Sequence, residues 1–381
     1  MAVTSAYIHI PFCRQICFYC DFNKFLIDRQ PVDQYLNALE EEIRQANIRK
    51  PLDSIYIGGG TPTALNEAQV KKMLDIVDRL VPLAEGAEYT VEVNPGEITM
   101  EKLTAMKNRG VNRLSIGVQS FETRLLEAIG RGHGRDDAVE AVKLAERAGF
   151  DNYSIDLMFG LPGQTMADFQ ASLDMAVSLN VPHISAYSLK IEEKTMFHNW
   201  YKQGRLTPFP EDTEADMYEL LLDYGSRNGL YPYEISNLAA AGYESFHNCV
   251  YWKNEEYYGF GAGAHGYVDG TRYANIAPLT HYIKAVEQGN TVVKEEMNVS
   301  SAEKMEEEMF LGLRMYAGVD KSRFKERYGM EYKEVFASAV PDLLENGLIE
   351  DDGEKVKLTP RGRLLGNEVF EKFLLEKDDA S

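Results

Sequence analysis

Three cysteines stand close together near the start of the chain, in the stretch PFCRQICFYCDF (residues 11–22). Cys13, Cys17 and Cys20 have the spacing C-x3-C-x2-C and follow directly on a short apolar run. Cysteine thiolates bind soft metals, which in proteins means zinc or iron–sulfur centres. The chain of 381 residues has one further cysteine, Cys249, far from this group. Three neighbouring thiolates without a fourth therefore predict a metal centre with one open position.

The alternative at this position is a closed zinc site. Structural zinc usually takes four protein ligands, and the nearest candidate for the fourth is His9. His9 lies between Ile8 and Ile10 in an expected strand, an alternation that is typical of a residue in the wall of a sheet. The pattern therefore favours an iron–sulfur cluster over zinc.

Six short runs rich in β-branched residues alternate with helical patterns in the first half of the chain and must position these cysteines. The runs are AYIHI (6–10), SIYIGG (54–59), YTVEV (89–93), RLSIGV (113–118), YSIDLMF (153–159) and HISAYSL (183–189). Amphipathic patterns such as residues 32–48 separate them, with apolar side chains three or four positions apart. This alternation predicts parallel βα units in an α/β fold, arranged as an open sheet or an incomplete barrel.

Glycine-rich or polar residues follow strand after strand of this series. The cysteines follow the first run, GGGTP (58–62) the second, NP (94–95) the third, QS (119–120) the fourth and GLPGQT (160–165) the fifth. The carboxyl ends of parallel strands lie on one side of a sheet, and ligands bind there. The sequence therefore predicts one site assembled from several strand ends.

Composition and charge narrow the classes of function. The formal net charge is −20, so the protein would be repelled by a phosphate backbone and we expect no nucleic-acid partner. No stretch approaches the roughly 18 to 20 apolar residues of a membrane span, and the N-terminus lacks the pattern of a secretion signal. Clustered cysteines without a disulfide pattern are typical of a reducing compartment. We therefore expect a cytoplasmic protein.

The cysteine spacing, with the aromatic Tyr19 just before the last cysteine, resembles the signature of the radical S-adenosylmethionine superfamily. The resemblance implies an incomplete (β/α)6 barrel in which three thiolates hold a 4Fe–4S cluster. In that superfamily S-adenosylmethionine chelates the fourth iron through its amino and carboxylate groups, and an electron from the cluster cleaves it to a 5′-deoxyadenosyl radical. The open position of the metal centre would then be the seat of S-adenosylmethionine.

The same resemblance assigns further residues to S-adenosylmethionine. Glycines in GGGTP would let the backbone approach the ligand closely, the carboxylate of Glu92 would accept hydrogen bonds from the ribose hydroxyls, and Arg131 would suit a carboxylate. The residues expected at this ligand are Tyr7, Tyr19, Gly59, Gly60, Thr61, Glu92, Gln119, Arg131 and Asp156.

Within the superfamily, the stretches YIHIPFC, GGGTPT, RLSIGVQSF and IDLMFGLPGQT resemble one branch. That branch contains the oxygen-independent coproporphyrinogen oxidases and a paralogous group of heme chaperones. The oxidases carry an additional cysteine at the position of Phe22 and an N-terminal extension, whereas the first expected strand of this chain begins at about residue 6. We therefore do not expect coproporphyrinogen oxidase activity.

The stretch HNCVYW resembles the H-N-x-x-Y-W signature of the heme chaperones, and the resemblance implies a heme site. The expected heme-binding residues are His247, Asn248, Tyr251 and Trp252. A neutral imidazole is a good axial ligand for heme iron, aromatic rings offer flat faces to a porphyrin, and an amide can orient the histidine or bind a propionate. The alternatives are a His247 that is merely packed in the interior, and iron ligation by Cys249 or His265.

The expected division of the chain has three parts. Residues 1–236 form the core barrel, residues 237–297 a connecting segment with the heme motif, and residues 298–381 a small α-rich, winged-helix-like C-terminal domain. The acidic stretch DDGE at the expected wing would repel phosphate and argues against DNA binding.

The expected function is that of a heme chaperone that binds a 4Fe–4S cluster, S-adenosylmethionine and heme. By resemblance it would deliver heme to apo-hemoproteins such as respiratory enzymes, including clients at the membrane, with a homodimer as a possible assembly. The alternative is a radical enzyme that oxidatively decarboxylates coproporphyrinogen III or another tetrapyrrole. A third interpretation is a cluster-bearing structural protein without turnover.

Overall fold

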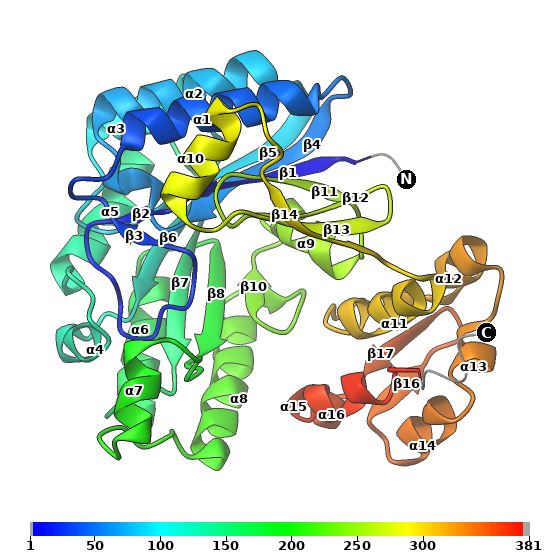
Figure 1. Ribbon diagram of the computed structural model, residues 1–381. Coiled ribbons are helices and arrows are strands. Elements are labelled where there is room, and N and C mark those ends of the chain that lie inside the picture. Colours follow the sequence, from blue (N-terminus) through cyan, green and yellow to red (C-terminus); the bar gives the residue numbers. More distant parts are fainter. Residues whose placement is uncertain (1–2, 376–381) are drawn as a thin grey trace.

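The computed structural model describes residues 3–375 and is built on one twelve-stranded sheet (Figure 1). Its centre is a series of six parallel strands that pair in chain order. These strands are β1 (Ser5–Ile10), β4 (Leu52–Gly59), β5 (Leu83–Val93), β6 (Arg113–Gln119), β7 (Tyr153–Phe159) and β8 (His183–Ser188). The first and the last of them do not pair with each other, so the predicted incomplete barrel of six βα units is confirmed.

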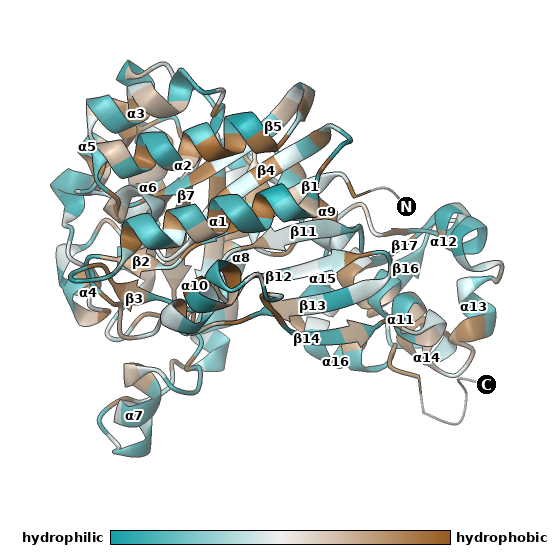
Figure 2. Ribbon diagram, turned by 45° about the horizontal axis from the view of Figure 1, so that its top comes forward, coloured by the Kyte–Doolittle hydropathy of each residue, from teal (hydrophilic) through white to brown (hydrophobic). Residues whose placement is uncertain are grey.

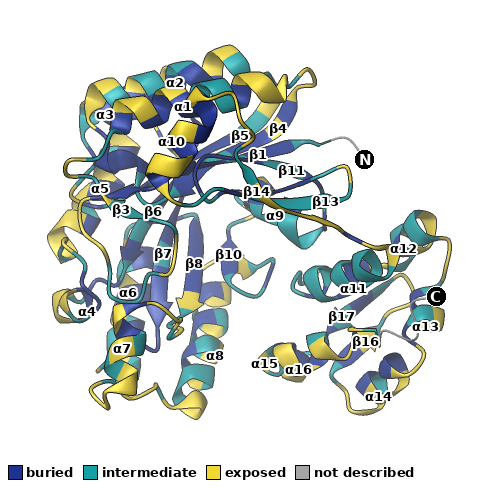
Figure 3. Cartoon of the chain, viewed as in Figure 1, coloured by how far each residue is buried: buried dark blue, intermediate teal, exposed yellow. Residues whose placement is uncertain are grey.

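Helices pack on the outside of these strands, as the amphipathic patterns predict (Figures 1 and 2). They are α1 (Val32–Ala46), α2 (Glu67–Leu80), α3 (Met100–Lys107), α4 (Thr123–Ala128), α5 (Arg135–Arg147), α6 (Met166–Ser178) and α8 (Glu211–Arg227). In α1 the side chains of Tyr35, Leu36 and Leu39 are buried. Figure 3 shows the same division for the central strands, which are largely buried beneath helices that are exposed on their outer side. Removing these apolar faces from water holds the helices on the sheet.

Short elements shape the carboxyl side of the central strands. They are β2 (Phe12–Cys13) and β3 (Phe25–Leu26), the 3-10 turn η1 (Pro62–Ala64), and α7 (Met196–Lys202). β2 and β3 pair in parallel on either side of the cysteine loop. The ring of Phe18 in that loop packs on Trp200 of α7, with 5.1 Å between centroids, so the loop is held at both its ends and its middle.

The sheet continues beyond the six strands on both sides. Next to β1 come β11 (Tyr257–Phe260), β12 (His265–Val268), β13 (Thr271–Asn275) and β14 (Val293–Asn298), and next to β8 come β10 (Asn237–Ala239) and β9 (Tyr231–Pro232). β11 pairs with β1 in parallel, and the other added strands pair antiparallel. Close packing requires glycine here, because a Cβ on Gly259 would lie 1.9 Å from the carbonyl oxygen of His265.

Two more helices accompany these added strands. α9 (Phe246–Trp252) lies between β10 and β11 and carries the HNCVYW stretch, and α10 (Leu279–Glu287) lies between β13 and β14. Tyr282 of α10 packs on Tyr35 of α1, with ring centroids 5.4 Å apart. Among the described residues, no helix combines the length and the apolarity needed to cross a membrane.

The C-terminal part has a hydrophobic core of its own. Its elements are α11 (Ser301–Gly312), β15 (Val319–Asp320), α12 (Lys321–Tyr328), α13 (Tyr332–Val335), α14 (Ala339–Glu345), β16 (Ile349–Asp351), β17 (Lys355–Leu358), α15 (Pro360–Leu364) and α16 (Gly366–Glu371). β16 and β17 form the antiparallel hairpin of the expected wing. The boundaries of the three expected domains stay a prediction; residues 237–297 contribute five strands to the main sheet.

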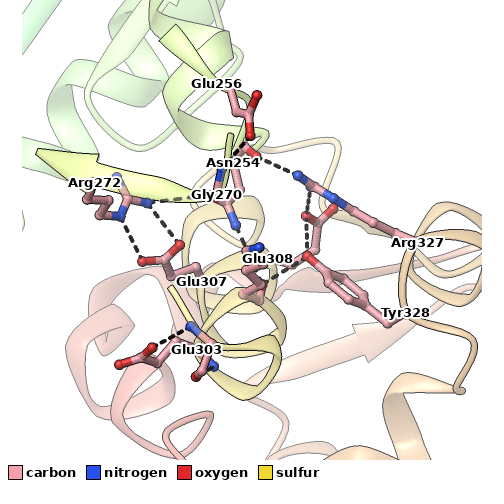
Figure 4. A network of polar contacts seen from close by, with 11 residues as sticks. Asn254, Glu256, Gly270, Arg272, Glu303, Glu307, Glu308, Arg327 and Tyr328 are labelled. Carbon is pink, nitrogen blue, oxygen red and sulfur yellow. Dashed lines mark hydrogen bonds and ion pairs between the residues drawn. The ribbon is translucent and has the colours of Figure 1, made fainter. Parts of the chain in front are cut away.

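A network of ion pairs and hydrogen bonds docks the C-terminal domain on the sheet and on the end of α9 (Figure 4). Arg272 of β13 makes two hydrogen bonds, of 3.0 and 2.9 Å, to the carboxylate of Glu307 in α11. Arg327 of α12 contacts Glu308 and donates at 2.9 Å to the carbonyl oxygen of Asn254, just beyond α9. The domain is thereby coupled to the helix that carries the HNCVYW stretch.

Candidate functional site

The three cysteines lie around one cavity of about 150 Å³ at the carboxyl ends of the strands (the cysteine cavity). Cys13 ends β2, and Cys17 and Cys20 lie in the loop that follows. The hydroxyl of Thr61 is 3.8 Å from Cys13 Sγ, and Nη1 of Arg131 is 3.6 Å from Cys17 Sγ. Three thiols that share a cavity with hydrogen-bond donors and a cation fit a thiolate-bound iron–sulfur cluster.

A single metal ion does not fit this arrangement. Among residues 3–375, no three His, Cys, Asp or Glu side chains come together closely enough to hold one ion. Both ring nitrogens of His9 are engaged, because Nε2–H donates to the carbonyl oxygen of Asn23 and Nδ1 accepts from the Tyr7 hydroxyl, each at 2.8 Å. His9 is therefore a wall residue here, not a zinc ligand. A cluster, in contrast, offers one iron to each thiolate, so its ligands need not converge on a point.

Three consecutive glycines at the end of β4 bring the backbone against the cysteine loop. A Cβ on Gly58 would lie 2.6 Å from the carboxyl carbon of Glu92, and one on Gly60 would lie 2.7 Å from the backbone nitrogen of Phe12. Gly59 has φ +114°, a conformation that residues with side chains rarely adopt. Each glycine of GGGTP is thus required for a reason of its own, and together they form a cradle that any side chain would fill.

Two half-buried carboxyl groups stand beside this cradle. Glu92 and Asp156 line the cysteine cavity and also a cavity of about 360 Å³ inside the barrel (the lumen cavity). Glu92 accepts from the Tyr56 hydroxyl at 2.8 Å and from Gly59 N at 3.0 Å. Burial, helped by the charge of Asp156, raises the pKa of Glu92 to about 7, and burial raises the pKa of Asp156 to about 6. Each Glu92 oxygen keeps a lone pair, so it can still accept from ribose hydroxyls.

Arg131 and Gln119 complete the wall of the cysteine cavity. Nη2 of Arg131 donates to Asn94 Oδ1 at 2.7 Å and contacts the carbonyl oxygen of Gly117, whereas its buried Nε has no partner among the described residues. Gln119 ends β6 with φ +66°, an energetically costly conformation that is common at binding sites. A guanidinium fixed in this way beside the thiols is suited to a ligand carboxylate.

The structure brings eight of the nine residues predicted for S-adenosylmethionine, and all three cysteines, to the cysteine cavity. Tyr7 is the exception. It lines a different cavity of about 540 Å³ (the side cavity), where its ring lies 6.2 Å from that of Tyr56. The donor set of the cysteine cavity fits the cofactor, while the ligand role of each residue stays a prediction.

His247 lies inside the barrel and is 1% exposed. The Ser54 hydroxyl donates to Ser5 Oγ at 2.8 Å. Nδ1–H of His247 therefore donates to Ser54 Oγ at 2.8 Å, and Nε2 accepts from the Tyr251 hydroxyl at 2.9 Å. Burial, and then the charge of Arg113, lower the pKa of His247 to about 3. The imidazole is thus neutral, and its lone pair is occupied by Tyr251.

α9 directs the other residues of its motif to different places. Asn248 lines the lumen cavity, and Tyr251 lines the side cavity. Trp252 packs under the guanidinium of Arg314, which lies 4.3 Å from the ring centroid. The four motif residues are thus gathered on one helix but do not line one pocket, and Tyr251 stands between the side cavity and Nε2 of His247.

The two alternative iron ligands differ in their access. His265 of β12 is exposed and lines the side cavity. Cys249 lies on α9 and lines neither the side cavity nor the lumen cavity, and burial raises the pKa of its thiol to about 11. Because the thiolate is the form that binds metals, Cys249 is the weaker alternative of the two.

Two residues that position α9 are not among those predicted from the sequence. The carboxylate of Glu88 in β5 accepts from Ser245 Oγ at 3.2 Å and from the next two backbone nitrogens at 2.8 and 3.0 Å. Tyr56 donates to Glu92 and stacks on His247, with ring centroids 5.3 Å apart. Neither belongs to a motif, and the only signal for them is the strand alternation that turns every second residue inward.

Comparison with known proteins agrees with this geometry. A model of the radical SAM superfamily matches residues 7–176, and a model of the HemN C-terminal domain matches residues 299–365. Among solved structures, coproporphyrinogen III oxidase (HemN) from Escherichia coli aligns with a TM-score of 0.85 at 24% identity, over 97% of this chain and 89% of that chain. This likeness confirms the fold.

Curated relatives share more of the sequence. The heme chaperone HemW of Bacillus subtilis is 51% identical over 376 residues, which are 98% of this chain and 99% of that protein. HemW of Lactococcus lactis is 42% identical (98% and 97% covered), and HemW of Escherichia coli is 34% identical (98% of each covered). The radical SAM match implies a 4Fe–4S cluster and S-adenosylmethionine. The chain therefore belongs to the HemW family of heme chaperones, within the radical SAM superfamily.

Proposed function

We propose that this chain binds heme at the mouth of its barrel and passes it to apo-hemoproteins, with the cytoplasm as its location. The observation that carries the proposal is 51% identity to a protein named heme chaperone HemW over 98% of the chain. The position of α9 supports it, because this helix stands between the lumen cavity and the side cavity and contributes one motif residue to each. Phe22 lines both cavities as well, so its ring is available to a flat ligand in either of them.

In this proposal Cys13, Cys17 and Cys20 hold the 4Fe–4S cluster, and the wall of the cysteine cavity holds S-adenosylmethionine. When bound, these groups supply one-electron chemistry at the carboxyl ends of the strands. The chain itself contributes the glycine cradle, the carboxyl group of Glu92 and the guanidinium of Arg131, which orient the ligand. Cys13 is almost wholly buried, so the protein also shields this side of the cluster from water.

Ligation of heme iron by His247 requires Tyr251 to move. The lone pair of the neutral imidazole is on Nε2, and it accepts the hydrogen bond of Tyr251 at 2.9 Å. Because Tyr251 lines the side cavity, a heme that arrives from there displaces the hydroxyl and takes its place. The same hydrogen bond competes with iron for Nε2 and helps to release the heme again, which suits a carrier better than a permanent heme protein.

A hemin titration of anaerobically reconstituted protein, followed by optical absorption, tests this function. We expect wild type and the matched control His265→Ala to bind about one hemin per chain with a similar spectrum. We expect His247→Ala to bind at least about tenfold more weakly, because an axial ligand is lost. Iron–sulfur absorbance shows for each variant that the cysteine cavity is intact.

Two results would contradict these assignments. Retained binding in His247→Ala, with loss in His265→Ala, would transfer the axial ligand to His265. The absence of saturable hemin binding by wild type would contradict the chaperone function itself.

A second candidate function is radical oxidation of a tetrapyrrole side chain. One observation favours it: Glu92, Gln119 and Asp156 line both the cysteine cavity and the lumen cavity, so the two spaces adjoin. Incubation with coproporphyrinogen III, S-adenosylmethionine and a one-electron reductant, followed by product analysis, separates the two functions. We expect no decarboxylated porphyrinogen, and its formation would establish the enzyme.

A further inference from the structure

A buried arginine inside the barrel has no partner among the described residues. Arg113, the first residue of β6, is 2% exposed and lines the lumen cavity. No hydrogen bond or ion pair of its guanidinium is found within residues 3–375, and its buried Nε is unsatisfied. Burying an unpaired charge is costly, so buried charges in proteins are normally paired or bind a ligand.

Other polar groups around Arg113 are unsatisfied too. Thr90 on β5 is the register partner of Arg113. In the described part of the chain, the buried hydroxyl oxygen of Thr90 has no hydrogen-bond partner, and neither has Nδ1 of His183. Burial, and then the charge of Arg113, lower the pKa of His183. Arg113 and Asn248 of α9 line the lumen cavity, whereas Thr90 and His183 do not. A buried guanidinium without a partner in the wall of a cavity points to a ligand.

The neighbouring carboxyl groups make no hydrogen bond or ion pair with Arg113 within residues 3–375, although its charge acts on Asp156 and partly offsets the rise in the pKa of that group that burial causes. Glu92 is held by the Tyr56 hydroxyl and by Gly59 N, and Asp156 accepts from Ser115 Oγ at 3.3 Å. Both carboxyl groups also form the wall of the cysteine cavity, which Arg113 does not line. The N–H donors of Arg113 at the floor of the lumen cavity therefore have no acceptor among the described residues and are available to a group that enters from the mouth.

The mouth of the lumen cavity is aromatic. Phe22 and Tyr187 both line it and are 64% and 44% exposed. One cavity thus combines a flat apolar rim with a cationic floor. This combination is complementary to a flat aromatic molecule that carries an acidic arm.

We propose that Arg113 and Asn248 bind a propionate carboxylate of the tetrapyrrole, while the ring rests on Phe22, the aromatic residue of the rim that the lumen cavity shares with the side cavity. The inference rests on the proposed heme function and names the group that the lumen cavity recognises. The other carboxylate available to the site is that of S-adenosylmethionine. We assign it to Arg131, which lines the cysteine cavity and not the lumen cavity.

The test compares hemin with hemin dimethyl ester, whose propionates carry no charge. Both are titrated, in the same detergent, into reconstituted wild type, Arg113→Gln and Arg113→Lys. We expect wild type to bind hemin about 10- to 100-fold more tightly than the ester, the effect of a hydrogen-bonded charge. Arg113→Gln should bind both compounds alike, and Arg113→Lys, which keeps the charge, should regain part of the preference. The affinity for S-adenosylmethionine should stay unchanged in both variants.

Several outcomes would overturn the inference. Equal binding of hemin and ester by wild type removes the propionate site and leaves heme binding intact. If Arg113→Gln binds S-adenosylmethionine more weakly and keeps the preference for hemin, the carboxylate that Arg113 binds belongs to S-adenosylmethionine instead. If wild type binds no hemin, the proposed function fails first. If Arg113→Gln does not fold, Asn248→Ala decides: a retained full preference for hemin in that variant counts against the site.

Discussion

At the scale of single residues, the cysteine cavity depends on glycine, because a larger residue would not fit beside the cysteine loop. Gly60 N donates to the carbonyl oxygen of Ile10 at 2.9 Å, and Thr61 N donates to that of Phe12 at 2.7 Å. A Cβ on Gly60 would meet backbone atoms of these two residues at 2.7 to 2.9 Å. Backbone atoms cannot rotate away as a flexible side chain can, so this short segment fixes the position of Cys13.

Replacing Gly60 by alanine should therefore displace the cysteine loop. We expect Gly60→Ala to lower the iron and sulfide content after anaerobic reconstitution and to destabilise the protein by about 1 to 3 kcal/mol, as overpacking does. The matched control is Gly134→Ala, because the nearest atoms to a Cβ there begin at 3.6 Å, an ordinary contact. A full cluster in Gly60→Ala would show that the loop does not depend on this contact.

The sequence predicts single residues well where spacing along the chain decides their role. Cys13, Cys17 and Cys20 are recognised in this way, because a loop of this length must place them near one another. Arg113 was not predicted, because a charged residue at the first position of an apolar run is typical of a strand end that is exposed to solvent. Only the register of β6 between β5 and β7 turns it into the barrel.

At the scale of elements, α9 is too short to be stable alone, because a helix of seven residues cannot offset the cost of nucleation. Its start is held from outside. Ser245 Oγ accepts from Asn248 N at 3.3 Å, and Glu88 accepts from Ser245 Oγ and the next two backbone nitrogens. A carboxylate at a helix N-terminus also interacts favourably with the helix dipole. The heme motif is thus positioned by one strand residue of the barrel.

Neutralising that carboxylate should loosen α9. We expect Glu88→Gln to weaken the cap by about 0.5 to 2 kcal/mol and to accelerate hydrogen–deuterium exchange of amides in residues 245–252, with β6 unchanged. The control is Glu85→Gln, which alters an exposed residue of the same strand. Equal exchange in α9 of both variants would show that Glu88 does not hold the helix.

The elements that the sequence predicts are those with a regular period. All six central strands begin within six residues of their expected starts, because β-branched runs between amphipathic helices have few other arrangements. The strands β11 to β14 were not foreseen. Their stretch is rich in glycine and aromatic residues, and its fold depends on contacts such as that of Gly266 with the ring of Tyr273, which no local pattern encodes.

At the scale of the whole molecule, the C-terminal domain is fastened to the barrel beside α9. Arg323 Nη2 donates to the carbonyl oxygen of Lys253 at 2.5 Å, and Arg327 Nη2 donates to that of Asn254 at 2.9 Å. These carbonyls directly follow the last turn of α9. The domain therefore supports the end of the motif helix, as Glu88 supports its start, and any movement of the domain changes the surroundings of Trp252.

A double-mutant cycle on Arg272 and Glu307 measures this docking. We expect a coupling free energy of about 1 kcal/mol between Arg272→Gln and Glu307→Gln, because the pair is bidentate and partly buried. Unfolding is followed by the fluorescence of Trp252 in a Trp200→Phe background. The control is the largely exposed pair Lys294 and Glu295, for which we expect almost no coupling. An equal coupling free energy in both cycles would contradict the docking role.

The twelve-stranded sheet is open, so it ends in two strands that each have one free side in the described part of the chain. β9 contains Pro232, which has no N–H to offer a further strand. β14 has the sequence VKEEMN and is exposed along nearly its whole length, and charged side chains of this kind prevent edge-to-edge growth. Two copies of the chain that associate would therefore meet through helices or through the C-terminal domain, and not as one sheet continued across both molecules.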